Sequence, residues 1–222
     1  MTRFSQAIVN VVLLLLAIAS GWFAIPHWRD GVAIGDAIPV PAYMVAQIPM
    51  PKLAYDDAVH ALGRADPENG WAHIARAEAA RQYGGAPQTQ ISEIERGLSL
   101  TPASSRGWTL LSEAWLPTDQ RLAAKMLSQA LLLGPNDFWL IGPRVQDAAV
   151  LWPYLDQDSK DLALAQTRML WEVPVLRGQL RVLLRSADGV NLASRAFKNR
   201  QEEVRQMNRW LSLDRQREAT MP

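Results

Sequence analysis

Hydrophobic residues recur at helical spacing through most of the chain after residue 52. Ala54, Ala58, Ala61 and Leu62 form the first apolar stripe, which ends at Asp66-Pro67. Turn signals such as Gly84-Gly85-Ala86-Pro87 and Pro117 separate the stripes that follow. We therefore expect an all-α fold. Its later helices are predicted at about residues 70–83, 89–100, 104–116, 119–133, 145–152, 159–171, 175–186 and 192–213.

A short proline-to-tryptophan phrase recurs along the predicted helices. Pro67 precedes Trp71, Pro102 precedes Trp108, and Pro135 precedes Trp139, and the prolines are 35 and 33 residues apart. One supersecondary unit of about 34 residues therefore repeats, which is typical of helical arrays. This period directs the functional search toward a binding surface rather than a catalytic pocket.

The repeated unit resembles the tetratricopeptide repeat (TPR), a helical hairpin of the same length. The matching positions are Trp71 and Ala75, Trp108 and Ser112, Gly97 and Pro102, Ala123 or Ala124, and Ala130 and Pro135. Small residues let two helices cross closely, and an adjacent aromatic side chain fills the remaining wedge. The resemblance covers residues 53–142 and implies a short right-handed α-solenoid. Pro143 stands where the third unit should have a small residue, so we expect residues 143–222 to form a helical cap.

The resemblance also implies a partner-binding groove, because TPR proteins bind extended peptides or helices along a concave surface lined by their first helices. The family's groove positions fall on three sets of residues here. They are Asn69, Ala72 and Arg76 in the first unit, Arg106, Thr109 and Glu113 in the second, and Asp137, Leu140 and Arg144 in the third. Small Ala72 is expected to leave room for a partner's backbone.

An uncharged apolar segment of 19 residues, 7–25, lies near the N-terminus. About 20 such residues cross a bilayer as a helix. Arg3 precedes the segment, and Trp22 and Trp28 lie at its far end. We expect residues 1–25 to be a signal-anchor in a bacterial inner membrane, with the N-terminus cytoplasmic and the bulk periplasmic. Alternatively, cleavage near Ala19 releases the chain into the periplasm; both alternatives put the remainder on the same side.

Residues 26–52 are rich in proline, with Ile-Pro-Val-Pro and Ile-Pro-Met-Pro runs at 38–41 and 48–51. Such runs fit neither a helix nor a central strand, so we expect an extended spacer. A second interpretation stays open, in which apolar residues of this segment pack against the first helices.

The formal net charge of +1 conceals a gradient along the chain. Residues 159–222 contain 12 Lys or Arg against 7 Asp or Glu, whereas residues 1–158 contain 11 against 15. Arg177, Arg181 and Arg185 recur every four residues, so they are expected to form one stripe on a helix. A partner's acidic patch, lipid headgroups or an anionic polysaccharide fits such a stripe, as do acidic residues of the same chain.

The sequence gives no support for catalysis. The absence of cysteine excludes disulfides and thiolate chemistry. No nucleophile elbow, phosphate-binding loop or dinucleotide fingerprint occurs. Asp56, Asp57 and His60 share a helix face, but two acids in a first helical turn are ordinary partners of the helix dipole. We expect no enzymatic activity, no cofactor, no metal and no nucleic-acid ligand. Of the nine tryptophans, we assign Trp71, Trp108 and Trp139 to packing within the repeats.

These features together predict a membrane-tethered TPR scaffold, or adaptor, that binds a partner protein outside the cytoplasm. An anchor followed by periplasmic repeats resembles accessory proteins of bacterial envelope polysaccharide synthesis or export. It also resembles the apocytochrome-holding factors of cytochrome c maturation. Two other hypotheses are a permanent structural subunit of a membrane complex and a sugar-binding module.

Overall fold

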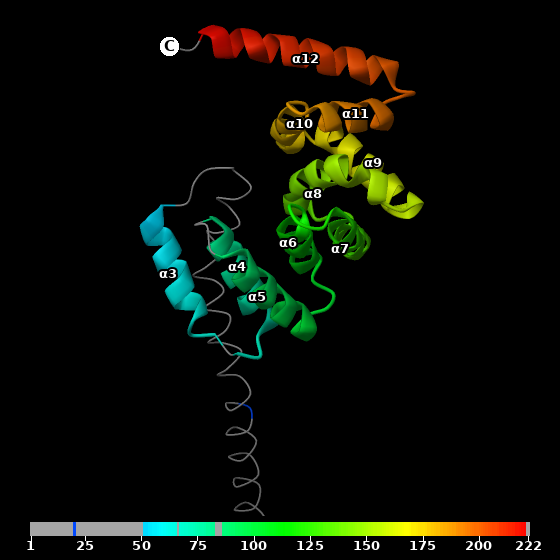
Figure 1. The fold of residues 1–222 in the computed structure, drawn as a ribbon. Helices are drawn as coiled ribbons and strands as arrows, with labels where there is room; N and C mark the ends of the chain where they lie inside the picture. The colour runs from blue at the N-terminus through cyan, green and yellow to red at the C-terminus, as the bar shows by residue number, and fades with distance from the viewer. Residues whose placement is uncertain (1–19, 21–50, 66, 83–85, 221–222) are drawn as a thin grey trace, which may run out of the picture. The chain divides into compact units, whose positions relative to one another are not determined.

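The computed structural model describes residues 20, 51–65, 67–82 and 86–220 (Figure 1). Apart from residue 20, the predicted membrane anchor lies outside these residues, as does nearly all of the predicted spacer. Within the part that is described, no helix is both long enough and apolar enough to span a bilayer.

The described residues form ten α-helices and two short 3-10 turns (Figure 1). The chain divides into two compact units, Met1–Pro102 and Ala103–Pro222, which we call unit 1 and unit 2. The helices of unit 1 are α3 (Lys52–Leu62), α4 (Gly70–Gln82) and α5 (Pro87–Leu100). Those of unit 2 are α6 (Ser105–Trp115), α7 (Gln120–Leu133), α8 (Phe138–Leu151), α9 (Gln157–Glu172), α10 (Arg177–Leu183), α11 (Ala187–Ala196) and α12 (Gln201–Thr220), with 3-10 turns at Trp152–Tyr154 and Pro174–Leu176.

Helices α4 and α5 of unit 1 form an antiparallel hairpin that crosses at two glycines. A Cβ added at Gly97 would lie 2.7 Å from Cγ1 of Ile74 and 2.9 Å from the carbonyl oxygen of Gly70. Glycine is therefore needed at position 97 for the two backbones to approach this closely. The prediction that Gly97 lies at a helix crossing is confirmed.

Helix α3 packs on the same hairpin through small side chains. The buried cluster of unit 1 consists of Ala58, Leu62, Ala65, Ala72 and Ala79. Ala72 has no solvent exposure. The space that we expected beside Ala72 for a partner's backbone is occupied by α3.

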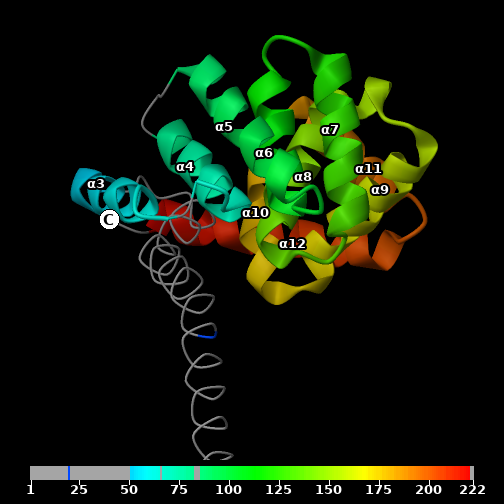
Figure 2. The ribbon, with the colours of Figure 1, turned by 90° about the horizontal axis from the view of Figure 1, so that it is seen from below.

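Helix α8 lies at the centre of unit 2 (Figure 2). It contacts the antiparallel pair α6 and α7 on one side and α9, α10 and α11 on the other. Its buried side chains include Ile141, Val145 and Leu151, which pack with Leu127 of α7 and Leu170 of α9. Removing this apolar surface from water is the main source of stability for such a core.

Capping residues set the start of several helices. The side chains of Ser104, Asp119, Asp156 and Ser186 each accept a hydrogen bond from a backbone N–H three residues later. These bonds satisfy donors that the first turn of a helix leaves unpaired. The predicted starts of the helices near residues 104 and 119 agree with these caps.

Three predicted helices differ from the observed ones. The helix expected at 192–213 is two helices, α11 and α12, because Phe197 leaves the helical conformation and packs into the core with 2% exposure. The helix expected at 145–152 starts at Phe138 and continues through Pro143. The helix expected at 175–186 is a 3-10 turn followed by α10, which ends at Leu183.

The proposed packing role of the repeat tryptophans was also wrong for two of them. Trp71 is 48% exposed and Trp139 is 66% exposed. The helices bury other residues instead, Ala72 and Ile74 in α4 and Ile141 in α8. Trp171 of α9, by contrast, is 8% exposed and belongs to the core of unit 2.

Candidate partner-binding groove between α10, α11 and α12

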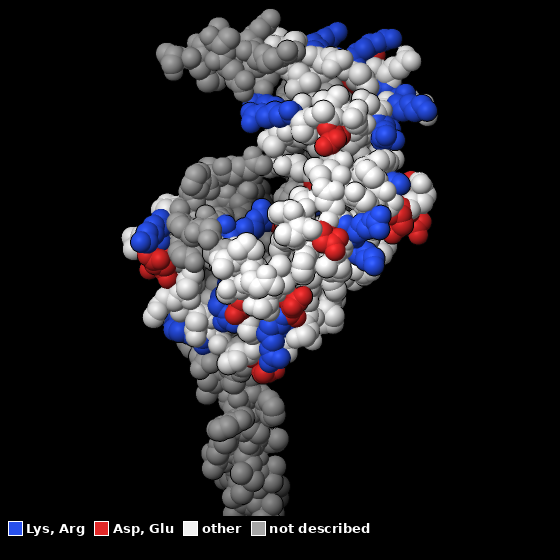
Figure 3. All heavy atoms as spheres, viewed as in Figure 1, with Lys and Arg blue, Asp and Glu red and all other residues white. Residues whose placement is uncertain are grey.

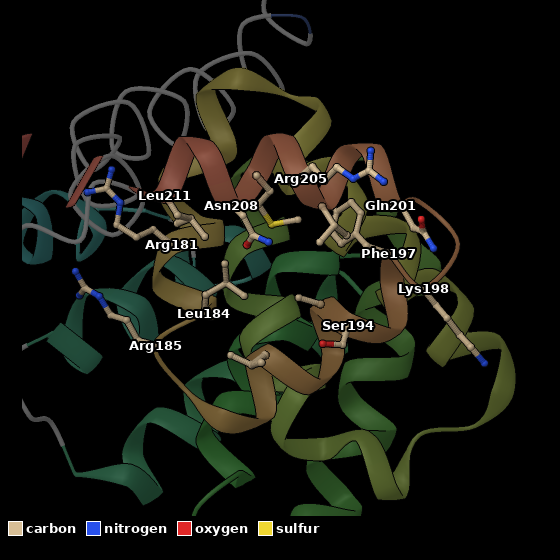
Figure 4. Close-up of a pocket in the computed structure, with 14 residues that line it drawn as sticks. Arg181, Leu184, Arg185, Ser194, Phe197, Lys198, Gln201, Arg205, Asn208 and Leu211 are labelled. Carbon is tan, nitrogen blue, oxygen red and sulfur yellow. The ribbon is translucent and has the colours of Figure 1, made fainter. Parts of the chain in front are cut away.

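The last three helices of unit 2 line an open groove of about 920 Å³ (Figure 4). Helix α11 contributes Val190, Ala193 and Ser194, followed by Phe197 and Lys198 at its end. Helix α12 contributes Gln201, Val204, Arg205, Met207, Asn208 and Leu211. Most of these positions are three or four residues apart, so each wall is one face of a helix.

Where its side chains are described, at residues 201–213, α12 joins the core beside the groove. Met207 is buried, and Val204, Trp210 and Leu211 pack against the core. The ring of Trp210 meets Trp171 edge-on, with the ring centroids 6.1 Å apart. At the start of α12, Arg200 pairs with Glu172 at 2.7 Å. These contacts hold α12 on the core, and Val204, Met207 and Leu211 also line the groove beside α11.

The floor of the groove is apolar. Ala193, Phe197 and Met207 are buried, with exposures of 6%, 2% and 6%. Leu184 and Leu211 are half-buried beside them. A recessed apolar surface of this kind, open to solvent, is typical of a binding site rather than of a plain exterior.

Four cationic side chains border the apolar floor. Arg181 and Arg185 lie at one end of the groove, and Lys198 and Arg205 lie toward the other (Figure 4). None of the described residues that line the groove is acidic. Arg205 approaches Glu202 at 3.5 Å, but both side chains are about 70% exposed, so this pair is weak.

The same bias is visible on the surface of unit 2. Figure 3 shows Lys and Arg gathered over α10, α11 and α12, where this face presents few Asp or Glu side chains. The excess of cations counted in the last third of the sequence is therefore concentrated in space. Such a surface favours an anionic partner.

Tryptophan rings hold several of the basic residues of this region. The guanidinium of Arg177 lies 4.5 Å from the centroid of Trp171, and its Nε donates to the Trp171 carbonyl at 3.0 Å. Arg181 lies 5.6 Å from Trp210, and Arg195 lies 5.2 Å from Trp152. Cation–π contacts of this kind fix the arginines within the fold. The sequence suggested only acidic residues as internal partners of these arginines, and nothing in its pattern pointed to the rings.

The predicted arginine stripe is therefore only partly present. Arg181 and Arg185 line the groove, whereas Arg177 is not among the residues that line it. Arg185 lies beyond the end of α10, so the three residues do not share one helix. Binding of an anionic group by these arginines stays a prediction.

The three TPR groove positions of unit 1 take part in internal contacts. The side chain of Asn69 accepts a hydrogen bond from the N–H of Ala72 at 3.2 Å. Arg76 donates to the carbonyl of Leu62 at 3.2 Å and to Glu93 Oε2 at 3.3 Å. Ala72 is buried and offers no surface to a partner in this structure.

A charged cluster around His73 joins α4 to α5. His73 Nδ1 lies 2.8 Å from Glu93 Oε2 and 2.8 Å from Arg76 Nη2, and Nε2 donates to the Pro67 carbonyl at 2.8 Å. Burial by itself raises the pKa of Glu93, but the hydrogen bond with His73 and the charge of Arg76 outweigh it and lower that pKa below 4.5. The cluster ties the hairpin to the preceding loop.

In unit 2, Arg144 and Thr109 are buried rather than open to a groove. Arg144 has no exposure; its Nε donates to Thr109 Oγ1 at 2.9 Å and its Nη1 to the Gly134 carbonyl at 2.6 Å. Burial lowers the pKa of Arg144 to about 10, although Asp137 opposes the shift. Arg106 has the same shift for the same reasons. Arg106, Glu113, Asp137 and Leu140 are half-buried, and partner contact at these positions stays a prediction.

The structure does not support a metal site at Asp56, Asp57 and His60. Helix α3 starts at Lys52 and has no acidic residue in its first turn, so both aspartates lie one turn later than expected. Among the described residues, no three His, Cys, Asp or Glu side chains converge in a way that could hold a metal ion.

Comparisons of the chain with protein-family models, with curated proteins and with solved structures find no match.

Proposed function

We propose that this chain is a non-enzymatic scaffold that is tethered to a membrane by residues 7–25 and binds a partner protein on the extracytoplasmic side. The partner belongs to an envelope complex, such as one for polysaccharide synthesis or export. The observation that carries the proposal is the open groove of α10, α11 and α12, whose apolar floor and cationic borders lie on a surface of unit 2.

The proposed architecture is a short TPR-like solenoid with a helical cap. The antiparallel pairs α4 with α5 and α6 with α7 support the repeats. In unit 2, hydrogen bonds join positions about one repeat apart, because Arg144 bonds Thr109 across 35 residues and Ser105 bonds Asp137 across 32. In this arrangement the groove belongs to the cap, which makes the C-terminal helices a binding element as well as a cover for the core.

Site-specific photo-crosslinking in intact cells tests partner binding. A benzoyl-phenylalanine at exposed Ser194 or Asn208 in the groove is expected to capture one discrete protein, purified through a C-terminal tag. The control position is Arg121, which is exposed on α7 and does not line the groove. No adduct at either groove position, or equal adducts at position 121, would count against the scaffold.

The absence of cysteine allows a clean test of topology. The variant Ser194→Cys is expected to react in intact cells, after the outer membrane is permeabilised, with a maleimide that cannot cross the inner membrane. Labelling only after lysis of the inner membrane would overturn the extracytoplasmic assignment. Recovery of the crosslinked partner in a single stable stoichiometric complex after solubilisation would instead favour a permanent structural subunit.

A further inference from the structure

We infer that the occupant of the groove is an amphipathic helix of the partner protein, with an apolar middle and Asp or Glu near both of its ends. The inference rests on the proposed scaffold function and names the chemistry of its partner. It is carried by the shape of the walls and by the positions of the cations.

The walls of the groove favour a helix as the occupant. Arg205, Asn208 and Leu211 of α12 face Leu184, Ser194 and Phe197 across the groove (Figure 4). Each helical wall presents ridges of side chains at spacings of three and four residues, and the ridges of a third helix pack between such rows. Helix-in-groove recognition uses this arrangement, with apolar anchors on one face of the bound helix.

The charges define both ends of the occupant. Because Arg181 and Arg185 border one end and Lys198 and Arg205 the other, carboxylates near both ends of a bound helix would each meet a cation. Its middle would lie over Phe197, Val204 and Met207, which offer only apolar surface. The absence of acidic residues among the described lining residues removes the repulsion that would otherwise exclude an acidic helix.

A lipid surface fits the same groove less well. A planar headgroup layer contacts side chains that project outward together, as cations do on a peripheral amphipathic helix. Here the apolar residues are recessed instead, since Phe197 is 2% exposed and Met207 is 6% exposed. A convex helix reaches such a floor, whereas a flat membrane surface does not.

Binding of synthetic peptides to the full chain in detergent micelles tests the inference. The probe is a fluorescent helix of about 15 residues, a length near the minimum for helicity in water, with leucines along one face and glutamates at both ends. One control peptide has lysines at its ends, and another has glutamine in place of leucine. Fluorescence anisotropy is expected to show saturable binding of the first peptide, with both controls at least tenfold weaker.

Variants of the chain locate the binding site. Arg185→Glu and Lys198→Glu, at opposite ends of the groove, are each expected to weaken binding about tenfold, since reversing a charge replaces attraction with repulsion. Ser194→Tyr is expected to block the groove without disturbing the core, because Ser194 is exposed. Arg121→Glu changes charge equally, away from the groove, and is expected to leave binding unchanged. Circular dichroism confirms that each variant is folded.

Several outcomes would overturn the inference. Binding of the lysine-ended peptide as tight as that of the glutamate-ended one would exclude charge recognition. Unchanged affinity in the Arg185 and Lys198 variants would place the peptide elsewhere. Binding to vesicles of anionic phosphatidylglycerol, without peptide binding, would make the groove a lipid site. If a protein is crosslinked at positions 194 and 208 and the acidic peptide does not compete with it for binding, the occupant inferred here is wrong. The scaffold function would still stand in that case.

Discussion

Arg144 shows how a single residue can join three elements of unit 2. It is carried by α8, and its guanidinium reaches Thr109 of α6 and the carbonyl of Gly134 at the end of α7. Nε and Nη1 of this buried cation are hydrogen-bonded, whereas Nη2 has no hydrogen-bond partner, and desolvation lowers the pKa of Arg144 to about 10. Its removal would leave a cavity and take one hydrogen bond from each of two polar partners, the Thr109 hydroxyl and the Gly134 carbonyl.

Replacement of Arg144 is therefore expected to destabilise unit 2. Arg144→Ala should cost about 3 kcal/mol of unfolding free energy, because it adds a cavity to the lost hydrogen bonds. Arg144→Met, which restores most of the volume, is expected to recover part of this loss. Urea unfolding followed by circular dichroism measures both variants. Equal stability of Arg144→Ala and wild type would contradict a structural role for the guanidinium.

Glu93 gives a prediction about pH. Its pKa is lowered in the folded state, so the carboxylate contributes stability that is present above about pH 4.5 and lost as the pH falls through its lowered pKa. Glu93→Gln is expected to cost about 1 kcal/mol at neutral pH and to flatten the loss of stability below pH 4.5. Thermal unfolding at several pH values measures the effect. The same acid dependence in both proteins would exclude this carboxylate as its source.

The spacing of Arg144 and Thr109 follows the predicted repeat period, but their orientation was predicted wrongly, because both side chains are buried. The 35-residue spacing between them equals that between Pro67 and Pro102. Periodicity cannot tell whether a polar side chain faces solvent or finds a buried partner one unit away, because that depends on tertiary packing. The same limit explains why Trp139 was assigned to packing although it is 66% exposed.

At the scale of elements, α12 depends on a small anchor. Trp210 contacts Trp171 edge-on and lies under Arg181, while Met207 enters the core beside it. Aromatic pairs of this type contribute about 1 kcal/mol beyond the area they bury. The groove therefore depends on a helix whose described contacts with the core lie between Arg200 and Leu211.

Trp210→Ala is expected to release α12 while the rest of unit 2 stays folded. Amide hydrogen exchange in α12 should accelerate at least tenfold, and exchange in α8 and α9 should change little. The matched control is Leu213→Ala, because Leu213 lies on α12 but is 52% exposed. Equal exchange in both variants would show that Trp210 does not anchor the helix.

The junction between α11 and α12 was missed in the sequence, although a local signal for it exists. Residues 192–213 contain neither proline nor glycine, but residues 198–203 are all polar, and Asn199 followed by Glu202 has the spacing of a helix N-terminus. The break occurs because Phe197 gains more from burial than the helix loses at that turn. The groove lies between these two helices. Because a single helix was predicted there, Lys198, Arg205 and Asn208 were not recognised as site residues.

At the scale of the whole molecule, the division at residues 102 and 103 falls inside the span that the sequence assigned to one array of repeats. The all-α class and most helices were predictable, because periodic stripes and turn residues are local signals. How consecutive hairpins group into compact units depends on contacts between distant residues, which no local pattern encodes.

The division predicts a local response to damage in unit 1. Gly97→Ala is expected to weaken hydrogen-exchange protection in α4 and α5 and to leave α8 and α9 unchanged, because its Cβ would meet Ile74 and the Gly70 backbone. Gly178→Ala is the control; a Cβ there has nothing within 4 Å, so the change should be neutral or slightly stabilising. Equal loss of protection in both units would show that they unfold as one.

The sequence separation between hydrogen-bonded side chains in unit 2 affects the order in which the chain folds. Thr109 bonds Arg144, Ser128 bonds Ser159 and Pro135 bonds Gln166, across 35, 31 and 31 residues. Each segment between two bonded residues has been synthesised before α12 is made. Proteins dominated by such short separations close small loops and fold rapidly. Within unit 2, each hairpin can therefore dock on the one before it while the ribosome is still adding later residues, and α12 is the last of the described helices to be made.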